Sequence, residues 1–297
     1  MSHPTPPVDV VRALLTDLLD DETLLVPAGL TPQQQSGDAV AAAQDIAAIV
    51  TAHRALRRSD QGDLVRSFCC PTSRVADLVE ALGPIALEPV EVTLVADSGL
   101  LGVEKSTHLL LDDDRVELVG LQVSLPRSGQ PDVFAHHVLA ALTFAMPCSV
   151  EVPQVPGWEL ALDVLQEDGA ERAAFRIESN SNGSRVQLLA DALSASVRRR
   201  VHFSVVGGTA ALAAGPGIDP DVAEATAVLA LLAGTVVAVA GGTTGDILTA
   251  LELGPVAAIE RAADCDPQQV RKLLQSIGIV RPREVLTHLQ SLGLLAD

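Results

Sequence analysis

Val65-Arg66-Ser67-Phe68-Cys69-Cys70-Pro71 is the first of six short apolar runs that recur along the chain at a nearly constant interval. The other five are 90–97, 116–126, 148–153, 171–178 and 201–208, and successive starts are separated by 25, 26, 32, 23 and 30 residues. A strand, a crossover helix and the return to a parallel strand need about 30 residues. Since the runs are almost continuously apolar, they indicate strands covered on both faces. The interval therefore predicts repeated βα units around a parallel sheet.

The stretches between these runs carry helix signals. Residues 75–82 place four apolar side chains on one helical face, and Gly83-Pro84 follows as a helix stop. We expect the first strand at Leu24–Ala28. The last strand has two candidates, Thr235–Gly241 and the shorter Ile277–Val280, and the second requires the segment before 241 to be helical. Either choice gives seven or eight parallel strands, which favours an α/β fold of the closed, TIM-like (β/α)8 barrel type with C-terminal helices.

No segment of the sequence looks like a linker between domains, so we expect a single domain over residues 1–297. Residues 1–23 are predicted to form an N-terminal helical extension. Residues 264–297 are predicted to form a C-terminal helical segment, because Asp266-Pro267 and Pro282 are typical helix starts.

Composition restricts the partners of the chain. The formal charge is −18, with 38 acidic and 20 basic side chains, and such a surface repels nucleic-acid phosphates and anionic lipids. The uncharged stretch Ala225–Gly245 is long enough to span a membrane. It is rich in Ala, Gly and Thr, and it lacks flanking Lys, Arg and aromatic residues, so we interpret it as buried core.

The four cysteines, at positions 69, 70, 148 and 265, show no CxxC spacing, which suits reduced thiols in the cytoplasm. Residues 1–9 lack the basic and apolar parts of a signal peptide, so we expect a cytoplasmic protein.

Candidate site residues follow from the barrel prediction, because barrel sites form at the carboxyl ends of the strands. We expect Asp97, Glu151 and Arg176 to converge in one cavity. The full set that this rule selects is Cys70, Asp97, Ser124, Glu151, Arg176, Glu178 and the pair Gly207-Gly208. Three carboxylates near one arginine can bind a cation, bind a polar ligand or transfer protons. The alternative is an internal ion pair between Arg176 and a neighbouring carboxylate that closes the barrel mouth.

Two glycine pairs suggest a second kind of site. Gly207-Gly208 ends the run 201–208, and Gly241-Gly242 would end the candidate strand 235–241. Backbone N–H groups at the last two strands of a barrel commonly hold phosphate. However, no Lys or Arg lies nearby in the sequence, and Gly-Gly is also an ordinary turn.

Common catalytic and cofactor motifs are missing. The sequence contains no HExxH, HxH or Cys/His metal spacing, no GxSxG elbow, and neither GxGxxG nor GxxxxGK[ST]. We therefore expect no metal and no cofactor.

The chain resembles an uncharacterised group of actinobacterial barrel-like proteins. The resemblance lies in residues 68–74 (Phe-Cys-Cys-Pro-Thr-Ser-Arg), in 150–153 (Val-Glu-Val-Pro) with Trp158, and in 276–295. It implies that Glu151, Glu284 and Arg176 are kept. It also implies that polar residues of the group are replaced: two lysines by Ala174 and Ser204, two histidines by Ala210-Ala211, and a Gly-Ser-Cys-Ser-Phe segment by residues 278–282. The resemblance thus predicts altered or lost catalysis.

Three functions agree with these observations. The first is a barrel that binds a small polar or anionic ligand at Glu151, Arg176 and Glu178. The second is a non-catalytic protein that pairs with a related active subunit, with a biosynthetic enzyme or with a second copy of itself. It is favoured by the missing lysines and histidines and by the apolar segment 205–214. The third is a metal-assisted lyase or aldolase using Asp97 and the two glutamates, which rests on the fold alone.

Overall fold

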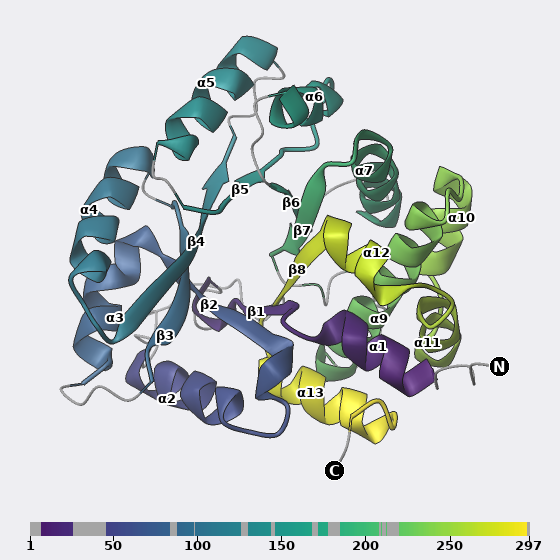
Figure 1. Cartoon of the computed structure of the whole chain (residues 1–297), viewed down its shortest axis with the longest axis horizontal. Helices are drawn as coiled ribbons and strands as arrows, with labels where there is room; N and C mark the ends of the chain where they lie inside the picture. Colours follow the sequence, from purple (N-terminus) through teal and green to yellow (C-terminus); the bar gives the residue numbers. More distant parts are fainter. Residues whose placement is uncertain are drawn as a thin grey trace, which may run out of the picture.

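The computed structural model of the chain describes residues 7–25, 46–83, 88–97, 99–125, 130–143, 146–167, 172–177, 185–207, 209, 212 and 220–295. Within these residues eight strands form one closed barrel in sequence order (Figure 1). The strands are β1 Leu19–Asp21, β2 Val65–Pro71, β3 Val90–Val95, β4 Val116–Ser124, β5 Cys148–Glu151, β6 Arg172–Arg176, β7 His202–Val206 and β8 Leu274–Ile279. All neighbouring pairs are parallel, and β1 pairs with β8 to close the ring. The predicted (β/α)8 barrel is confirmed.

Helices surround the barrel on its outer face (Figure 1). They are α1 Pro7–Leu15, α2 Ile46–Arg57, α3 Val75–Ala81, α4 Gly99–Leu111, α5 Pro131–Leu142, α6 Glu159–Glu167, α7 Arg185–Arg199, α9 Pro220–Val239, α10 Thr244–Leu251, α11 Pro255–Ala262, α12 Pro267–Leu273 and α13 Pro282–Ser291. Proline stands at the first turn of α11, α12 and α13, where its missing N–H costs no helix hydrogen bond.

The first strand differs from the sequence prediction. Leu24 and Leu25 belong to a short 3-10 helix, Thr23–Leu25, and residues 26–28 of the predicted strand lie outside the described residues. The strand is β1, which pairs through Leu19 with Val65 of β2 and with Ile277 of β8. The prediction of a purely helical extension over 1–23 was therefore wrong, because this segment contains α1 followed by β1.

The last strand is the second of the two candidates. β8 covers Leu274–Ile279, whereas most of Thr235–Gly241 belongs to α9, so a strand at that position was wrong. The C-terminal segment 264–297 is accordingly not helical throughout, since β8 lies between α12 and α13.

The buried helix α9 explains the uncharged stretch of the sequence. Its window Val222–Val239 has the length and hydropathy of a membrane span, but 78% of that window is buried inside the protein. Helices α10, α11 and α13 pack against α9 and cover its apolar side chains.

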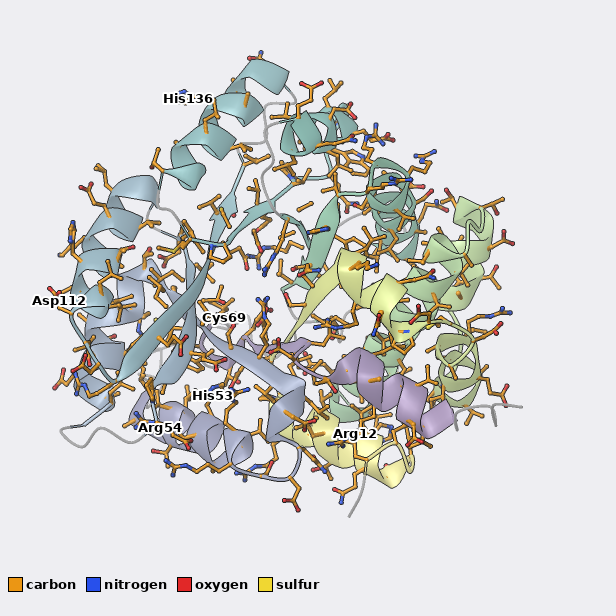
Figure 2. All side chains as sticks on the ribbon, viewed as in Figure 1. Arg12, His53, Arg54, Cys69, Asp112 and His136 are labelled. Atoms are coloured by element: carbon orange, nitrogen blue, oxygen red, sulfur yellow. The ribbon has the colours of Figure 1, made fainter. Side chains whose placement is uncertain are left out.

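Polar side chains occupy part of the barrel interior. Phe68 packs on His53 of α2, outside the barrel, so its neighbours Ser67 and Cys69 face the axis, and Figure 2 shows Cys69 towards the centre. Ser67 donates a hydrogen bond to Asp20 Oδ1 (2.7 Å) and also contacts the Thr93 hydroxyl (2.8 Å). Barrel interiors are usually filled by branched apolar side chains. This one is polar from β1 to β3.

Candidate functional site

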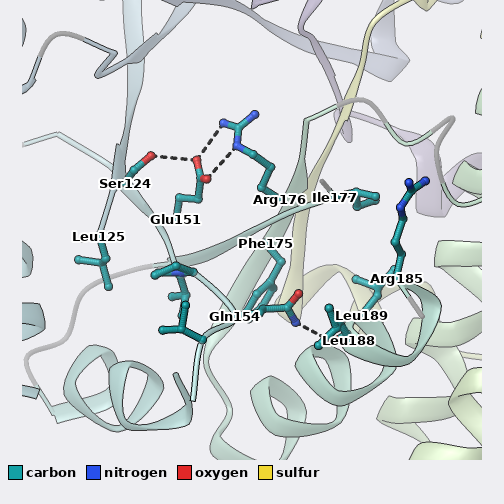
Figure 3. Close-up of a pocket in the computed structure, with 13 residues that line it drawn as sticks. Ser124, Leu125, Glu151, Gln154, Phe175, Arg176, Ile177, Arg185, Leu188 and Leu189 are labelled. Carbon is teal, nitrogen blue, oxygen red and sulfur yellow. Dashed lines mark hydrogen bonds and ion pairs between the residues drawn. The ribbon is translucent and has the colours of Figure 1, made fainter. Parts of the chain in front are cut away.

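An arginine–glutamate pair spans the ends of β5 and β6 (Figure 3). Arg176 donates from Nε to Glu151 Oε1 and from an Nη to Oε2, both at 2.8 Å. Such two-point pairing fixes the planes of both groups. Ser124, at the end of β4, donates to Glu151 Oε2 at 3.0 Å, and Gln122 does so at 3.4 Å. The internal ion pair expected as one alternative is therefore present, and it extends over three neighbouring strands.

Glycine makes room for Arg176 at the end of β7. Gly207 has a φ of +92°, which side chains larger than hydrogen rarely adopt. A β-carbon at this position would also lie 2.9 Å from Cγ of Arg176. Arg176 can lie across the mouth because residue 207 has no side chain.

A cavity of about 390 Å³ opens beside the pair. Among the described residues, its charged lining residues are Glu151, Arg176 and Arg185, the last from the first turn of α7 (Figure 3). The remaining lining residues are Ser124, Leu125, Val152, Pro153, Gln154, Val155, Phe175, Ile177, Leu188 and Leu189. The side chain of Gln154 donates to the carbonyl of Leu188 at 2.7 Å, which ties the loop after β5 to α7. The cavity therefore has a polar end at the barrel mouth and an apolar wall under α7.

Asp97 lies in a different polar group. Its carboxylate accepts hydrogen bonds from the Thr72 hydroxyl (2.7 Å), from the Ser73 backbone N–H (3.0 Å) and from the Ser73 hydroxyl. Partial burial acts to raise the pKa of Asp97, but the bonds from Ser73 and Thr72 outweigh it and lower the pKa. Asp97 does not line the cavity beside Glu151 and Arg176. It holds the turn after β2 to the end of β3.

Two predicted residues, Glu178 and Gly208, lie outside the described residues. Sequence reasoning also missed Glu22, which directly follows β1 and is 1% exposed. Glu22 Oε2 accepts the Gly207 N–H at 2.8 Å, and its carboxylate occupies the place where Gly278 of β8 has no side chain. The acidic run Asp20-Asp21-Glu22 could have identified Glu22 from the sequence, but this run lies outside the strand predicted at 24–28.

The described backbone N–H groups after β7 and β8 donate to the chain's own carboxylates. The N–H of Gly207, at the end of β7, donates to Glu22. After β8, the N–H groups of Val280 and Arg281 donate to Glu224 of α9 at 2.8 and 3.0 Å. Burial raises the pKa of Glu224, and these two bonds oppose the shift. The other pair, Gly241-Gly242, follows α9 and not a strand.

Three of the four cysteines have a raised pKa. Burial, followed by the charges of Asp20 and Glu22, raises the pKa of Cys69 well above its usual value. Burial also raises the pKa of Cys70 to about 12 and that of Cys265 to about 11. A nucleophilic cysteine needs a lowered pKa, so none of these three resembles one.

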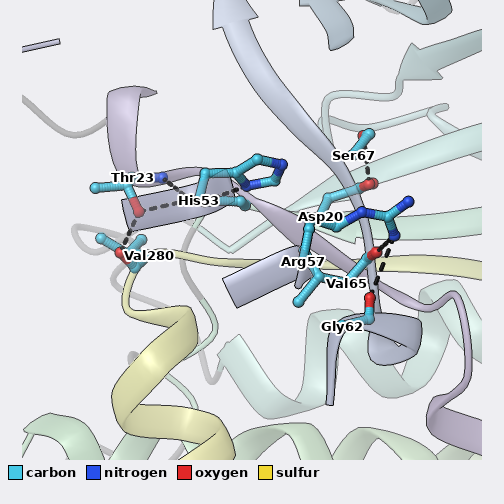
Figure 4. A network of polar contacts seen from close by, with 9 residues as sticks. Asp20, Thr23, His53, Arg57, Gly62, Val65, Ser67 and Val280 are labelled. Carbon is cyan, nitrogen blue, oxygen red and sulfur yellow. Dashed lines mark hydrogen bonds and ion pairs between the residues drawn. The ribbon is translucent and has the colours of Figure 1, made fainter. Parts of the chain in front are cut away.

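The hydrogen-bonded pair formed by His53 and Asp21 has a structural role outside the barrel mouth. His53 Nδ1 lies 2.8 Å from Asp21 Oδ2, and both side chains are buried between α2 and β1. The Thr23 hydroxyl lies within hydrogen-bond distance of both Asp21 Oδ1 and the carbonyl oxygen of Val280, so the network joins α2, β1 and the end of β8 (Figure 4). Among the described residues no three His, Cys, Asp or Glu side chains are grouped to hold a metal ion.

The fold and the mouth together define a (β/α)8 barrel with a polar cavity at the carboxyl ends of its strands. Comparisons with protein-family models, with curated proteins and with solved structures found no match to this chain. The resemblance to the actinobacterial group therefore stays a prediction.

Proposed function

We propose that this barrel binds a small polar or anionic ligand in the cavity beside Glu151 and Arg176. The observation that carries the proposal is the placement of this cavity. It lies at the ends of β4, β5 and β6, where barrels bind their ligands, and it joins fixed polar groups to an apolar wall. Its volume, about 390 Å³, suits a small molecule and not a polymer.

Altered or lost catalysis is the second part of the proposal. Glu151 already accepts four hydrogen bonds, two of them from Arg176, which leaves it little capacity to take a proton from a ligand. Ser204 on β7 accepts a hydrogen bond from Ser276 at 2.9 Å, and a nucleophilic serine needs a base as its partner instead. These contacts support a site that binds its ligand without forming a covalent bond to it.

A cavity-filling variant tests the binding site without assuming the ligand's chemistry. Val155→Phe places a larger side chain in the cavity lining, whereas Val256→Phe adds the same atoms at an exposed position of α11. We expect ligand-observed NMR with a library of small organic acids, amides and alcohols to detect binders to the unmodified chain and to Val256→Phe. Those binders should be lost in Val155→Phe. Binding that survives in Val155→Phe, or a library without any binder, contradicts the proposal.

A further inference from the structure

Helix α4 presents several leucines to solvent. Leu101 is 83% exposed, Leu111 is 66% exposed and Leu109 is about half exposed. α5, the neighbour of α4 in the outer ring, adds Leu139 (Figure 1). The other large apolar side chains that are exposed among the described residues stand alone on their helices: Val8 on α1, Leu160 on α6 and Val256 on α11. A single exposed leucine is ordinary on a protein surface, whereas several on one helix mark an interaction surface.

The charges of α4 suit contact with a second copy of the chain. The whole chain carries −18, so most of its surface repels a copy of itself. α4 contains one glutamate, Glu104, and one lysine, Lys105, so this helix has no net charge. Two copies can therefore meet at α4 with little repulsion, and the exposed leucines supply apolar contact there.

Lys105 and Asp112 make this surface complementary to itself. The exposed positions 101, 105, 108 and 112 follow one another at intervals of four and three residues, which keeps them on one side of the helix. Asp112 directly follows α4, and Figure 2 shows it at the outer edge of the protein. If two antiparallel copies of α4 cross between residues 108 and 109, Lys105 lies opposite Asp112 of the second copy. A two-fold axis at the crossing repeats this pair.

From these features we propose that the chain forms a two-fold homodimer in which α4 packs antiparallel against α4 of a second copy. A stable interface needs about 800 Å² from each partner. α4 is about 20 Å long, so α5 with Leu139 must contribute at the edge. Lys105 and Asp112 fix the direction in which the two helices run. α4 does not line the cavity beside Glu151 and Arg176, so this inference is independent of the proposed function.

Sedimentation velocity over a range of concentrations tests the dimer. The unmodified chain should dimerise with a Kd in the micromolar range. Leu101→Glu removes an apolar contact and adds a negative charge in both copies, so it should raise the Kd about a hundredfold, or tenfold for each copy. Val256→Glu makes a similar change at an exposed position of α11 and should leave the Kd unchanged.

Charge reversal tests how the two helices are paired. Lys105→Asp places two carboxylates opposite each other and should raise the Kd about tenfold at low ionic strength. Adding Asp112→Lys restores the pair with its charges exchanged, so the Kd should return to within about threefold of the original value. A carbodiimide, which joins an amine directly to a carboxylate, should link Lys105 of one chain to Asp112 of another. Mass spectrometry of mixed labelled and unlabelled chains identifies that link.

The opposite outcomes are equally clear. A chain that stays monomeric at every concentration leaves α4 to a different protein or to solvent, and the proposal is then wrong. A dimer that Leu101→Glu and Lys105→Asp do not weaken uses another surface, which also overturns the proposal. A double charge reversal that remains as weak as Lys105→Asp alone rules out the antiparallel pairing.

Discussion

Replacing Gly278 with alanine tests whether the buried Glu22 carboxylate organises the barrel mouth. A β-carbon at residue 278 would lie 2.6 Å from Glu22 Oε2 and closer still to Cδ and Oε1. Glu22 is 1% exposed, so its carboxylate can move only against buried neighbours. The substitution should therefore displace Glu22 and break its hydrogen bond with the Gly207 N–H.

The expected cost follows from these contacts. Loss of a hydrogen bond to a charged group is worth about 2 kcal/mol, and overpacking adds about 1–3 kcal/mol. The smaller unfolded-state entropy of alanine offsets about 0.5–1 kcal/mol. We expect Gly278→Ala to lower the free energy of unfolding by about 2–4 kcal/mol.

Urea unfolding, followed by circular dichroism and by Trp158 fluorescence, measures this change where the two transitions coincide. Gly245→Ala in α10 is the matched control, because its nearest atom would be Thr243 Oγ1 at 3.7 Å and helical alanine should stabilise by about 0.5–1 kcal/mol. In a Glu22→Ala background Gly278→Ala should cost nothing, because the clash is gone. An equal cost in both backgrounds would refute the reasoning.

Three further results are expected. Cys69 and Cys70 should resist a thiol-specific aromatic disulfide reagent at neutral pH in the folded chain and react fully after denaturation, because burial raises the pKa of both; rapid modification in the folded state would contradict this. The raised pKa of Glu224 means that the folded state binds the Glu224 proton more tightly than the unfolded state does. The protonated side chain therefore stabilises the fold fully below pH 4.5, and this contribution is lost as the pH rises through the pKa of the folded state. The unfolding midpoint of Glu224→Gln should not show this decline. Ser204→Ala should cost about 1 kcal/mol through its bond with Ser276 but leave ligand affinity unchanged, since Ser204 does not line the cavity, and a loss of binding would contradict that.

The sequence predicted the barrel well because its repeat is long and regular. Six of the eight strands are apolar runs covered on both faces, and their spacing alone implies parallel crossovers. β1 escaped this reasoning because it has three residues, two of them aspartates, and becomes a strand only through its partners β2 and β8. Thr235–Gly241 has strand-like residues, yet burial under α10 and α11 keeps most of this segment in the helix α9.

The residues of the candidate site were selected in part for a related reason. Glu151 and Arg176 are the last residues of β5 and β6, so the rule that selects strand ends found them both. Glu22 was missed because the first strand was predicted at Leu24–Ala28, whereas β1 ends at Asp21, directly before Glu22. Glu224 lies in the helix α9 and contacts the backbone after β8. A rule that selects only residues at strand ends cannot find it.

A crystal structure of the chain with a small molecule that binds the unmodified protein but not Val155→Phe tests the ligand site most directly. The account predicts electron density for this ligand in the cavity at the ends of β4, β5 and β6, beside the Glu151–Arg176 pair and the apolar wall. Density confined to another surface, or a cavity closed by its own side chains at a saturating ligand concentration, would contradict the account.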